Sequence, residues 1–130
     1  MKTITIKIFR ASINLGLKKG YSQETISEKE VINFLQAYQE KMIVEENIYL
    51  SASIINNMIV LSGQAEPHLK IEFINYPRFF YKESLLKEKI NELAELLLNK
   101  FEQNRIVIIY DDKTVMIEQS DEIDPQITLG

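Results

Sequence analysis

The sequence predicts an α+β domain in which a ferredoxin-like split β-α-β sheet carries extra strands and has both helices on one face. Three observations predict this class. Short alternating apolar runs are typical of strands, two segments have the apolar spacing of amphipathic helices, and strands precede, separate and follow the two helices. The expected order is β-α-β-β-β-α-β-β, and right-handed crossovers should bring the first and fifth strands close together.

The N-terminal segment alternates between polar and apolar residues. Ile4, Ile6 and Ile8 recur at every second position, so a half-buried first strand is expected at residues 4–9. Residues 13–26 contain two glycines and a mixed polarity, which indicates an irregular loop, with an extension of the strand at its start left open.

The first helix has a clear start signal. Ser27 and Glu30 match a capping box, in which the serine side chain accepts from a backbone amide and the glutamate bonds back to the cap. The following apolar residues keep a spacing of three or four, and the helix is expected to end near Ile43. These residues are Val31, Phe34, Leu35, Tyr38 and Met42.

A β-hairpin is predicted in the middle of the chain. Two runs rich in β-forming residues, 48–55 and 58–62, are separated by Asn56 and Asn57, and asparagine tolerates the positive φ of a tight turn. A further alternating strand follows at residues 68–73 and places its polar side chains on one face.

The second half predicts a helix and two more strands. Ser84 is the expected N-cap of a helix whose apolar stripe packs deeply. Residues 105–110 then read as an apolar central strand, and 114–118 as its hairpin partner. Residues 1–118 are expected to form a single domain, with 119–130 an acidic tail that is flexible or reaches a neighbouring subunit.

Length and composition limit the classes of protein. The chain has 130 residues, a net charge of −4 and no cysteine, which fits one globular domain, disfavours nucleic-acid binding and excludes disulfides and thiolate metal sites. No apolar run is long enough for a signal peptide or a membrane span, so a cytoplasmic protein is expected. An uncovered sheet face carrying Phe9, Tyr49 and Ile55 would be unusually apolar, which favours a homo-oligomer.

The first candidate site is the glycine-flanked segment that contains Lys18 and Lys19. Backbone amides and two lysine charges could together attract a phosphate or another anion. The segment matches neither the P-loop nor the dinucleotide-binding pattern, so a solvated loop is the favoured interpretation.

The second candidate is His68, the only histidine, with Glu66 and Glu72 nearby in the chain. A histidine beside a carboxylate is sufficient for proton transfer, which makes these three residues the catalytic candidates. A surface histidine without a role is the commoner case. His68 and Glu72 would lie roughly 13 Å apart along a strand, too far to share a metal ion, so no metal site and no cofactor are predicted.

The third candidate is the segment 75–81, which places Tyr76 and Arg78 among further aromatic residues. Such a composition suits stacking on a planar ligand or a protein interface, although rings that cap the core are the favoured interpretation. Together with Arg10 and Arg105, Arg78 completes the set of arginines, and two of them at one sheet end would form a fork for an anion.

One family resemblance adds to this. The predicted second helix, followed by residues 103–110, resembles the second half of small tautomerase-like proteins, in which a long helix leads into an arginine-containing central strand. The resemblance covers about a third of the chain and implies a dimeric or trimeric α+β assembly. That family uses an N-terminal proline as its base, whereas Lys2 follows Met1 here, so the activity does not carry over.

Two functions follow from these features. The preferred prediction is an oligomeric binding or regulatory protein that recognises a protein or an anionic small molecule, because the sequence offers surfaces but no evident catalytic set. The alternative is a small isomerase or hydrolase that uses His68, a nearby glutamate and an arginine. The alternative requires these groups to converge in one pocket.

Overall fold

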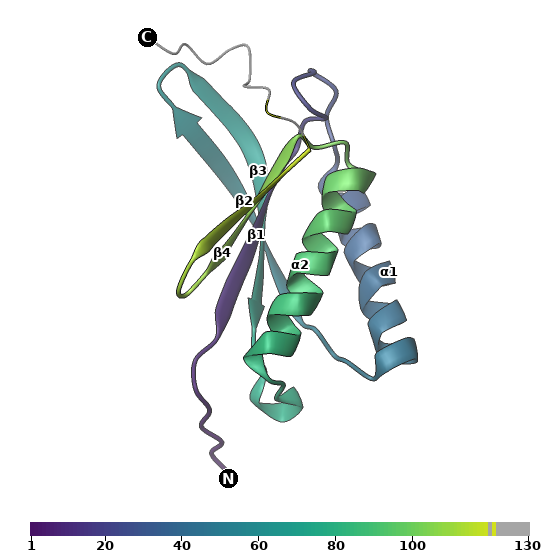
Figure 1. Ribbon diagram of the computed structural model, residues 1–130, viewed down its shortest axis with the longest axis vertical. Coiled ribbons are helices and arrows are strands. Elements are labelled where there is room, and N and C mark those ends of the chain that lie inside the picture. Colours follow the sequence, from purple (N-terminus) through teal and green to yellow (C-terminus); the bar gives the residue numbers. More distant parts are fainter. Residues whose placement is uncertain (120, 122–130) are drawn as a thin grey trace.

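A computed structural model of the chain describes residues 1–119 and 121. These residues form two long helices, one short 3-10 helix and a five-stranded sheet (Figure 1). In chain order the elements are β1 (Arg10–Gly16), α1 (Glu28–Glu46), β2 (Ala52–Leu61), β3 (Gln64–Ile74), η1 (Pro77–Phe79), α2 (Glu83–Lys100), β4 (Arg105–Tyr110) and β5 (Thr114–Glu118).

The sheet has the order β2-β3-β1-β4-β5, and every neighbouring pair is antiparallel. Its first four strands have the ferredoxin-like arrangement, and β5 is an extra edge strand. Both α1 and α2 lie against the same face (Figure 1). The predicted α+β class, the alternation of a strand, a helix, a group of strands, a second helix and two final strands, and the position of the first strand beside the apolar strand 105–110 are confirmed.

The core lies between this face and the two helices. Alternate residues of the three central strands point toward the helices and are buried, as period-two packing requires. They are Ala11, Ile13 and Leu15 of β1, Leu69, Ile71 and Phe73 of β3, and Ile106 and Ile108 of β4. The apolar stripes of α1 and α2 pack on them, which confirms the predicted helix faces.

The two helices are also joined by a buried lysine. Lys89 of α2 is 6% exposed, and its Nζ lies 2.7 Å from a carboxylate oxygen of Glu46 in α1 and 3.8 Å from Glu92. The hydrogen bond to Glu46 raises the pKa of Lys89 against the opposing effect of burial. The Tyr38 hydroxyl donates to the Lys89 carbonyl at 3.0 Å, so polar bonds fix the spacing of the helices.

The helix ends differ in how they are capped. The Ser27 Oγ accepts from the Glu30 amide at 3.1 Å, and the Glu30 carboxylate accepts from the Ser27 amide at 2.9 Å, which confirms the capping box. The cap predicted at Ser84 is wrong, because α2 already begins at Glu83, with Lys82 as an N-cap that forms no side-chain bond.

The first strand lies later in the chain than predicted. Residues 4–9 form no strand, because the last residue pair of β1 with β3 joins Arg10 to Ile74 and leaves the earlier residues without a partner. Ile4 and Ile8 are consequently exposed, whereas Phe9, which was expected on the open face, is buried. The strand occupies part of the predicted loop instead.

The predicted turn at Asn56 and Asn57 is also misplaced. Both residues lie inside β2, paired with Leu69 and His68 of β3, so the two short strands predicted on either side are halves of one strand. The chain reverses at Ser62 and Gly63. Ser62 has a φ of 51°, so it adopts the left-handed conformation that had been assigned to asparagine.

The ends of β2 and β3 project beyond the sheet as a two-stranded arm of residues 58–67 (Figure 1). Pairing of β3 with β1 stops at His68, while pairing with β2 continues to Gln64. Four successive apolar residues of the arm are exposed, namely Met58, Ile59, Val60 and Leu61. An isolated hairpin with such a surface is marginal in water, so the arm is a surface suited to association.

No helix among residues 1–119 and 121 is long and apolar enough to cross a bilayer. Of the predicted acidic tail, only Gln119 and Asp121 belong to the described residues, so the prediction for 119–130 lies almost wholly outside them. The Gln119 amide donates to the Asn104 carbonyl at 2.9 Å, which holds the end of the β5 segment beside the start of β4.

The capping box generates a stability prediction. Ser27→Ala removes the acceptor for the Glu30 amide, and we expect it to lower the free energy of unfolding by about 1 kcal/mol in urea titrations. Ser84→Ala is the matched control, since Ser84 caps nothing, and it should change stability by less than about 0.5 kcal/mol. Equal effects of the two substitutions would contradict the capping assignment.

The exposed arm generates a prediction about self-association, which was expected from the sequence. Val60→Lys places a charge on the arm, and we expect it to raise the dissociation constant of the self-associated form at least tenfold in sedimentation velocity. Val44→Lys is the control, because Val44 is 74% exposed on α1, away from the arm. A wild-type chain that sediments as a monomer at all concentrations would contradict the prediction.

Candidate functional site

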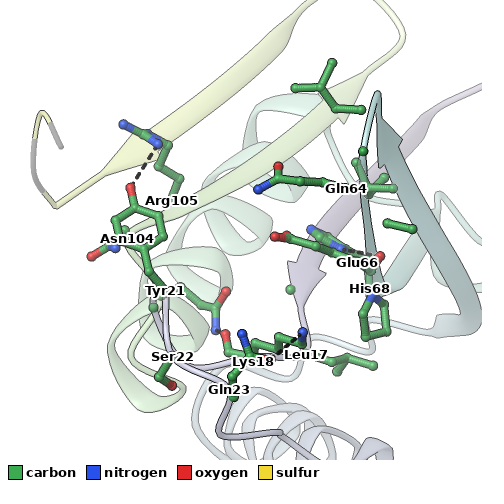
Figure 2. A pocket seen from close by; sticks show the side chains of 18 residues that line it. Leu17, Lys18, Tyr21, Ser22, Gln23, Gln64, Glu66, His68, Asn104 and Arg105 are labelled. Atoms are coloured by element: carbon green, nitrogen blue, oxygen red, sulfur yellow. Dashed lines mark hydrogen bonds between the residues drawn. The ribbon is translucent and has the colours of Figure 1, made fainter. Parts of the chain in front are cut away.

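A pocket of about 530 Å³ lies where the arm leaves the sheet. Three segments form it: the loop that follows β1, the base of the arm and the start of β4. The lining residues are Gly16, Leu17, Lys18, Gly20, Tyr21, Ser22, Gln23, Ile59, Leu61, Gly63, Gln64, Ala65, Glu66, Pro67, His68, Gln103, Asn104 and Arg105. Figure 2 shows Gln64 and Glu66 extending from the arm toward the side that carries Tyr21 and Arg105.

The loop after β1 is held by backbone bonds. The Leu17 amide donates to the Pro67 carbonyl at 3.0 Å, and the Ile26 amide donates back to the Leu17 carbonyl at 2.8 Å. Gly20 has a φ of 51°, and its amide donates to the Glu102 carbonyl at 2.9 Å. This left-handed conformation is disfavoured for residues with a Cβ, so the glycine lets the loop close against the end of α2.

The two lysines of this loop have different roles. The Lys19 Nζ lies 3.2 Å from Glu24 and 3.3 Å from Glu102, and these carboxylates raise its pKa. Lys19 stabilises the loop through these ion pairs and does not line the pocket. Lys18 does line it, with its Nζ donating to the Gln23 Oε1 at 3.1 Å. Of the two predicted anion-binding lysines, only Lys18 is placed to meet a ligand.

Strand β3 presents three polar side chains to the pocket from alternate positions, namely Gln64 and Glu66 of the arm and His68 at its base. Alternate residues of a strand point to the same face, and here it is the face that the helices leave uncovered. Glu66 and His68 are partly buried, and the His68 Nδ1 lies 3.3 Å from the Glu66 carbonyl oxygen. Glu66 and His68 therefore line the same pocket, although the contact between them involves the Glu66 backbone and not its carboxylate.

Arg105 supplies the opposite charge at the first residue of β4. Its Nε donates to the Glu118 carboxylate at 2.7 Å, and its Nη1 donates to the Tyr21 hydroxyl at 3.2 Å (Figure 2). The hydrogen bond to Glu118 is the main cause that raises the pKa of Arg105. The guanidinium is fixed by β5 and by the loop at the edge of the pocket.

The other predicted site residues lie elsewhere. Arg10 and Glu72 line a second hollow of about 440 Å³ toward the opposite end of the sheet. Tyr76 and Arg78 lie at the start of η1, where the Tyr76 and Phe79 rings stack with centroids 6.0 Å apart. Arg105 lines the first pocket and Arg10 the second, so these two arginines do not meet, and Arg78 lines neither pocket.

Glu72 is accordingly separated from His68, since it pairs with Ser12 while His68 pairs with Gly16 at the other end of β1. Within the described part of the chain, no three histidine, cysteine, aspartate or glutamate side chains gather as a metal site would require. The pocket combines one carboxylate, one imidazole and two basic groups in a partly enclosed space. Such a set can orient a ligand that carries both charges.

The pocket also contains polar residues that were not predicted as site residues. They are Tyr21, Ser22, Gln23, Gln64, Gln103 and Asn104. Among these residues, Gln103 has a physical property that can indicate a functional role, because it is polar and yet only 7% exposed. Its side chain bonds to the nearby Phe101 carbonyl and to the distant Lys18 carbonyl, and the second of these contacts cannot be read from a local pattern in the sequence.

Comparisons with known proteins show the fold. No family model matches the chain, and no curated protein matches it. Two solved structures are similar. A phage SAM lyase in its apo state has a TM-score of 0.71 and 19% identity, over 88% of this chain and 91% of that chain. A phage SAM lyase in complex with S-methyl-5′-thioadenosine has a TM-score of 0.70 and 18% identity, over 95% and 98%.

These matches correct the preferred functional prediction. Both similar folds are described as lyases, which contradicts the preferred prediction of a binding or regulatory protein. The error arose because the convergence of Glu66, His68 and Arg105 depends on topology and cannot be read from the sequence. The matches do not test the tautomerase resemblance or the oligomeric state, and both stay predictions.

Proposed function

We propose that this chain is a small enzyme that cleaves S-adenosylmethionine and releases S-methyl-5′-thioadenosine. One observation carries the proposal: Glu66, His68, Lys18 and Arg105 line a single pocket on a fold shared with phage SAM lyases. The sequence-based condition for an enzyme was that a histidine, a glutamate and an arginine meet in one pocket. This pocket meets that condition.

The lining of the pocket suits the groups of this substrate. S-adenosylmethionine carries a positive sulfonium and ammonium, a negative carboxylate and a flat adenine ring. Lys18 and Arg105 supply positive charge for the carboxylate, while Glu66 supplies negative charge for the cationic part. Ile59 and Leu61 of the arm add apolar surface on which a nucleoside can pack.

The proposed reaction breaks the bond between the sulfonium sulfur and the γ carbon of the amino-acid chain. Both bonding electrons stay with the sulfur, so the positive charge disappears and a neutral thioether leaves. A lyase uses no water, and the γ carbon therefore replaces its bond to sulfur with a new bond to another atom of the substrate. Either the substrate carboxylate closes on it, or a base such as the Glu66 carboxylate accepts a proton from the adjacent carbon and an alkene forms. Each route balances without a nucleophile from the protein.

The residues of the pocket would then act by orientation and by charge. Glu66 points into the pocket from the arm and is the one carboxylate of its lining, so we assign it the contact with the cationic part of the substrate. Holding the chain in the geometry for C–S cleavage is a form of catalysis that needs no covalent intermediate. We further infer that the enzyme acts in the cytoplasm.

The test is the release of S-methyl-5′-thioadenosine from S-adenosylmethionine by the purified full chain, followed by liquid chromatography. We expect release well above the spontaneous rate. Glu66→Gln keeps the shape of the side chain but removes its charge, and we expect kcat/KM to fall by roughly 100-fold.

Glu72→Gln is the matched control, because Glu72 lies on the same strand and the same face but outside the pocket. Its kcat/KM should stay within about threefold of wild type. No release above the spontaneous rate by the wild-type chain would refute the proposed activity. Equal losses in both variants, with unchanged melting temperatures, would refute the role of Glu66.

A further inference from the structure

Gln103 is held in one orientation at the floor of the pocket. Its side-chain Nε2 donates to the Lys18 carbonyl and to the Phe101 carbonyl, both at 2.9 Å. These two bonds use both amide hydrogens, so the carbonyl oxygen Oε1 is directed away from them. No residue in the described part of the chain donates a hydrogen bond to Oε1. A side chain that is 93% buried thus offers a fixed acceptor to the pocket.

His68 offers a second acceptor close by. Its Nδ1 lies 3.3 Å from the Glu66 carbonyl oxygen, and a carbonyl can only accept, so this contact requires the hydrogen to be on Nδ1. In the neutral imidazole the other nitrogen, Nε2, is then an acceptor. The backbone of the arm therefore selects the tautomer that presents a lone pair.

Gly16 leaves the space between the two acceptors empty. It pairs with His68 across the β1–β3 ladder. A methyl group added to Gly16 would lie 3.0 Å from the Gln103 Oε1 and 3.6 Å from the His68 Nε2. A ligand atom cannot occupy the Cβ position itself, which is within bonding distance of the Gly16 Cα. The missing side chain instead keeps open a position just beyond it, on the side of Gly16 where both acceptors lie.

We infer that this position binds the primary ammonium group of the substrate. Two acceptors that face one gap need a ligand group with at least two hydrogens to donate. A hydroxyl has one, a carboxylate has none, the adenine amino group has two and an ammonium has three. Of the last two groups, only the ammonium carries the positive charge that the nearby Glu66 carboxylate attracts. Glu66 extends from the same face of β3 as His68 and adds negative charge, and we assign the substrate carboxylate to the basic side of the pocket, which carries Lys18 and Arg105.

This inference rests on the proposed function and deepens it, because it assigns the amino-acid end of S-adenosylmethionine to Gly16, His68 and Gln103. Binding through hydrogen bonds to a charged group is specific, since a ligand without the ammonium leaves two acceptors unsatisfied. The three residues would therefore determine specificity for an amino acid over its deaminated form.

The test measures binding by titration calorimetry with two probes that have no sulfonium and are not cleaved. One is S-adenosylhomocysteine, and the other is its analogue with hydrogen in place of the α-amino group. We expect the wild-type chain to bind the first at least tenfold more tightly, which corresponds to about 1.4 kcal/mol. Equal affinity for the two probes would overturn the inference, and so would failure to bind either.

Gly16→Ala fills the gap with one methyl group and leaves both acceptors in the chain. We expect it to weaken S-adenosylhomocysteine about tenfold and to leave the deaminated analogue within twofold, so the analogue serves as the internal control. Equal weakening of both probes would overturn the inference, because it would indicate a general distortion of the pocket. His68→Leu provides a second variant, with the same selective loss expected.

The two proposals fail in different ways. Discrimination between the probes without release of S-methyl-5′-thioadenosine from S-adenosylmethionine would refute the proposed activity and support the ammonium site. Release of the thioether without discrimination would support the activity and refute the ammonium site.

Discussion

The structure depends on the central position of β1, which pairs with β3 on one side and with β4 on the other. Every residue that lines the pocket is placed directly or indirectly by this pairing. The β1–β3 ladder sets Gly16 opposite His68, and the chain that leaves β1 becomes the loop that carries Lys18 and Tyr21. The β1–β4 ladder brings the start of β4, with Arg105, to the same end of the sheet. Strand β1 therefore contributes buried residues to the core and also positions the segments that line the pocket.

Helices were predictable because their signals are local. The capping box at Ser27 and the stripe of the second helix depend on residues a few positions apart, and both agree with the structure to within a few residues. Strand limits depend instead on partners. Residues 4–9 alternate well but have no neighbouring strand, and Asn56 has turn propensity but pairs with Leu69. Pairing with a distant segment overrides local preference in both places.

The candidate site was predictable by residue type but not by position. Glu66, His68, Lys18 and Arg105 were recognised from their chemistry, yet Glu72, Lys19, Arg10, Tyr76 and Arg78 had equal claims. Contacts between distant segments decide which of these residues line the pocket, and the bond from Gln103 to Lys18 across 85 positions is one such contact. Tyr21 and Gln64 could be identified as pocket residues only from such contacts. Charge and residue type indicate what a chain can bind, whereas topology decides where.

The arm has a consequence for how such a protein can diversify. Residues 58–67 form ladder pairs only with one another, and the bond from Leu17 to Pro67 lies at the base of the arm, so the register of the other strands does not depend on the length of the arm. Adding or removing one residue on each side of Ser62 and Gly63 would lengthen or shorten one wall of the pocket while the sheet, the helices and the loop after β1 keep their places. The size of molecule admitted and the stability of the fold are therefore encoded in separate parts of the chain. Insertions at the tip of the arm would change which substrates fit the pocket and leave the packing of the core unchanged.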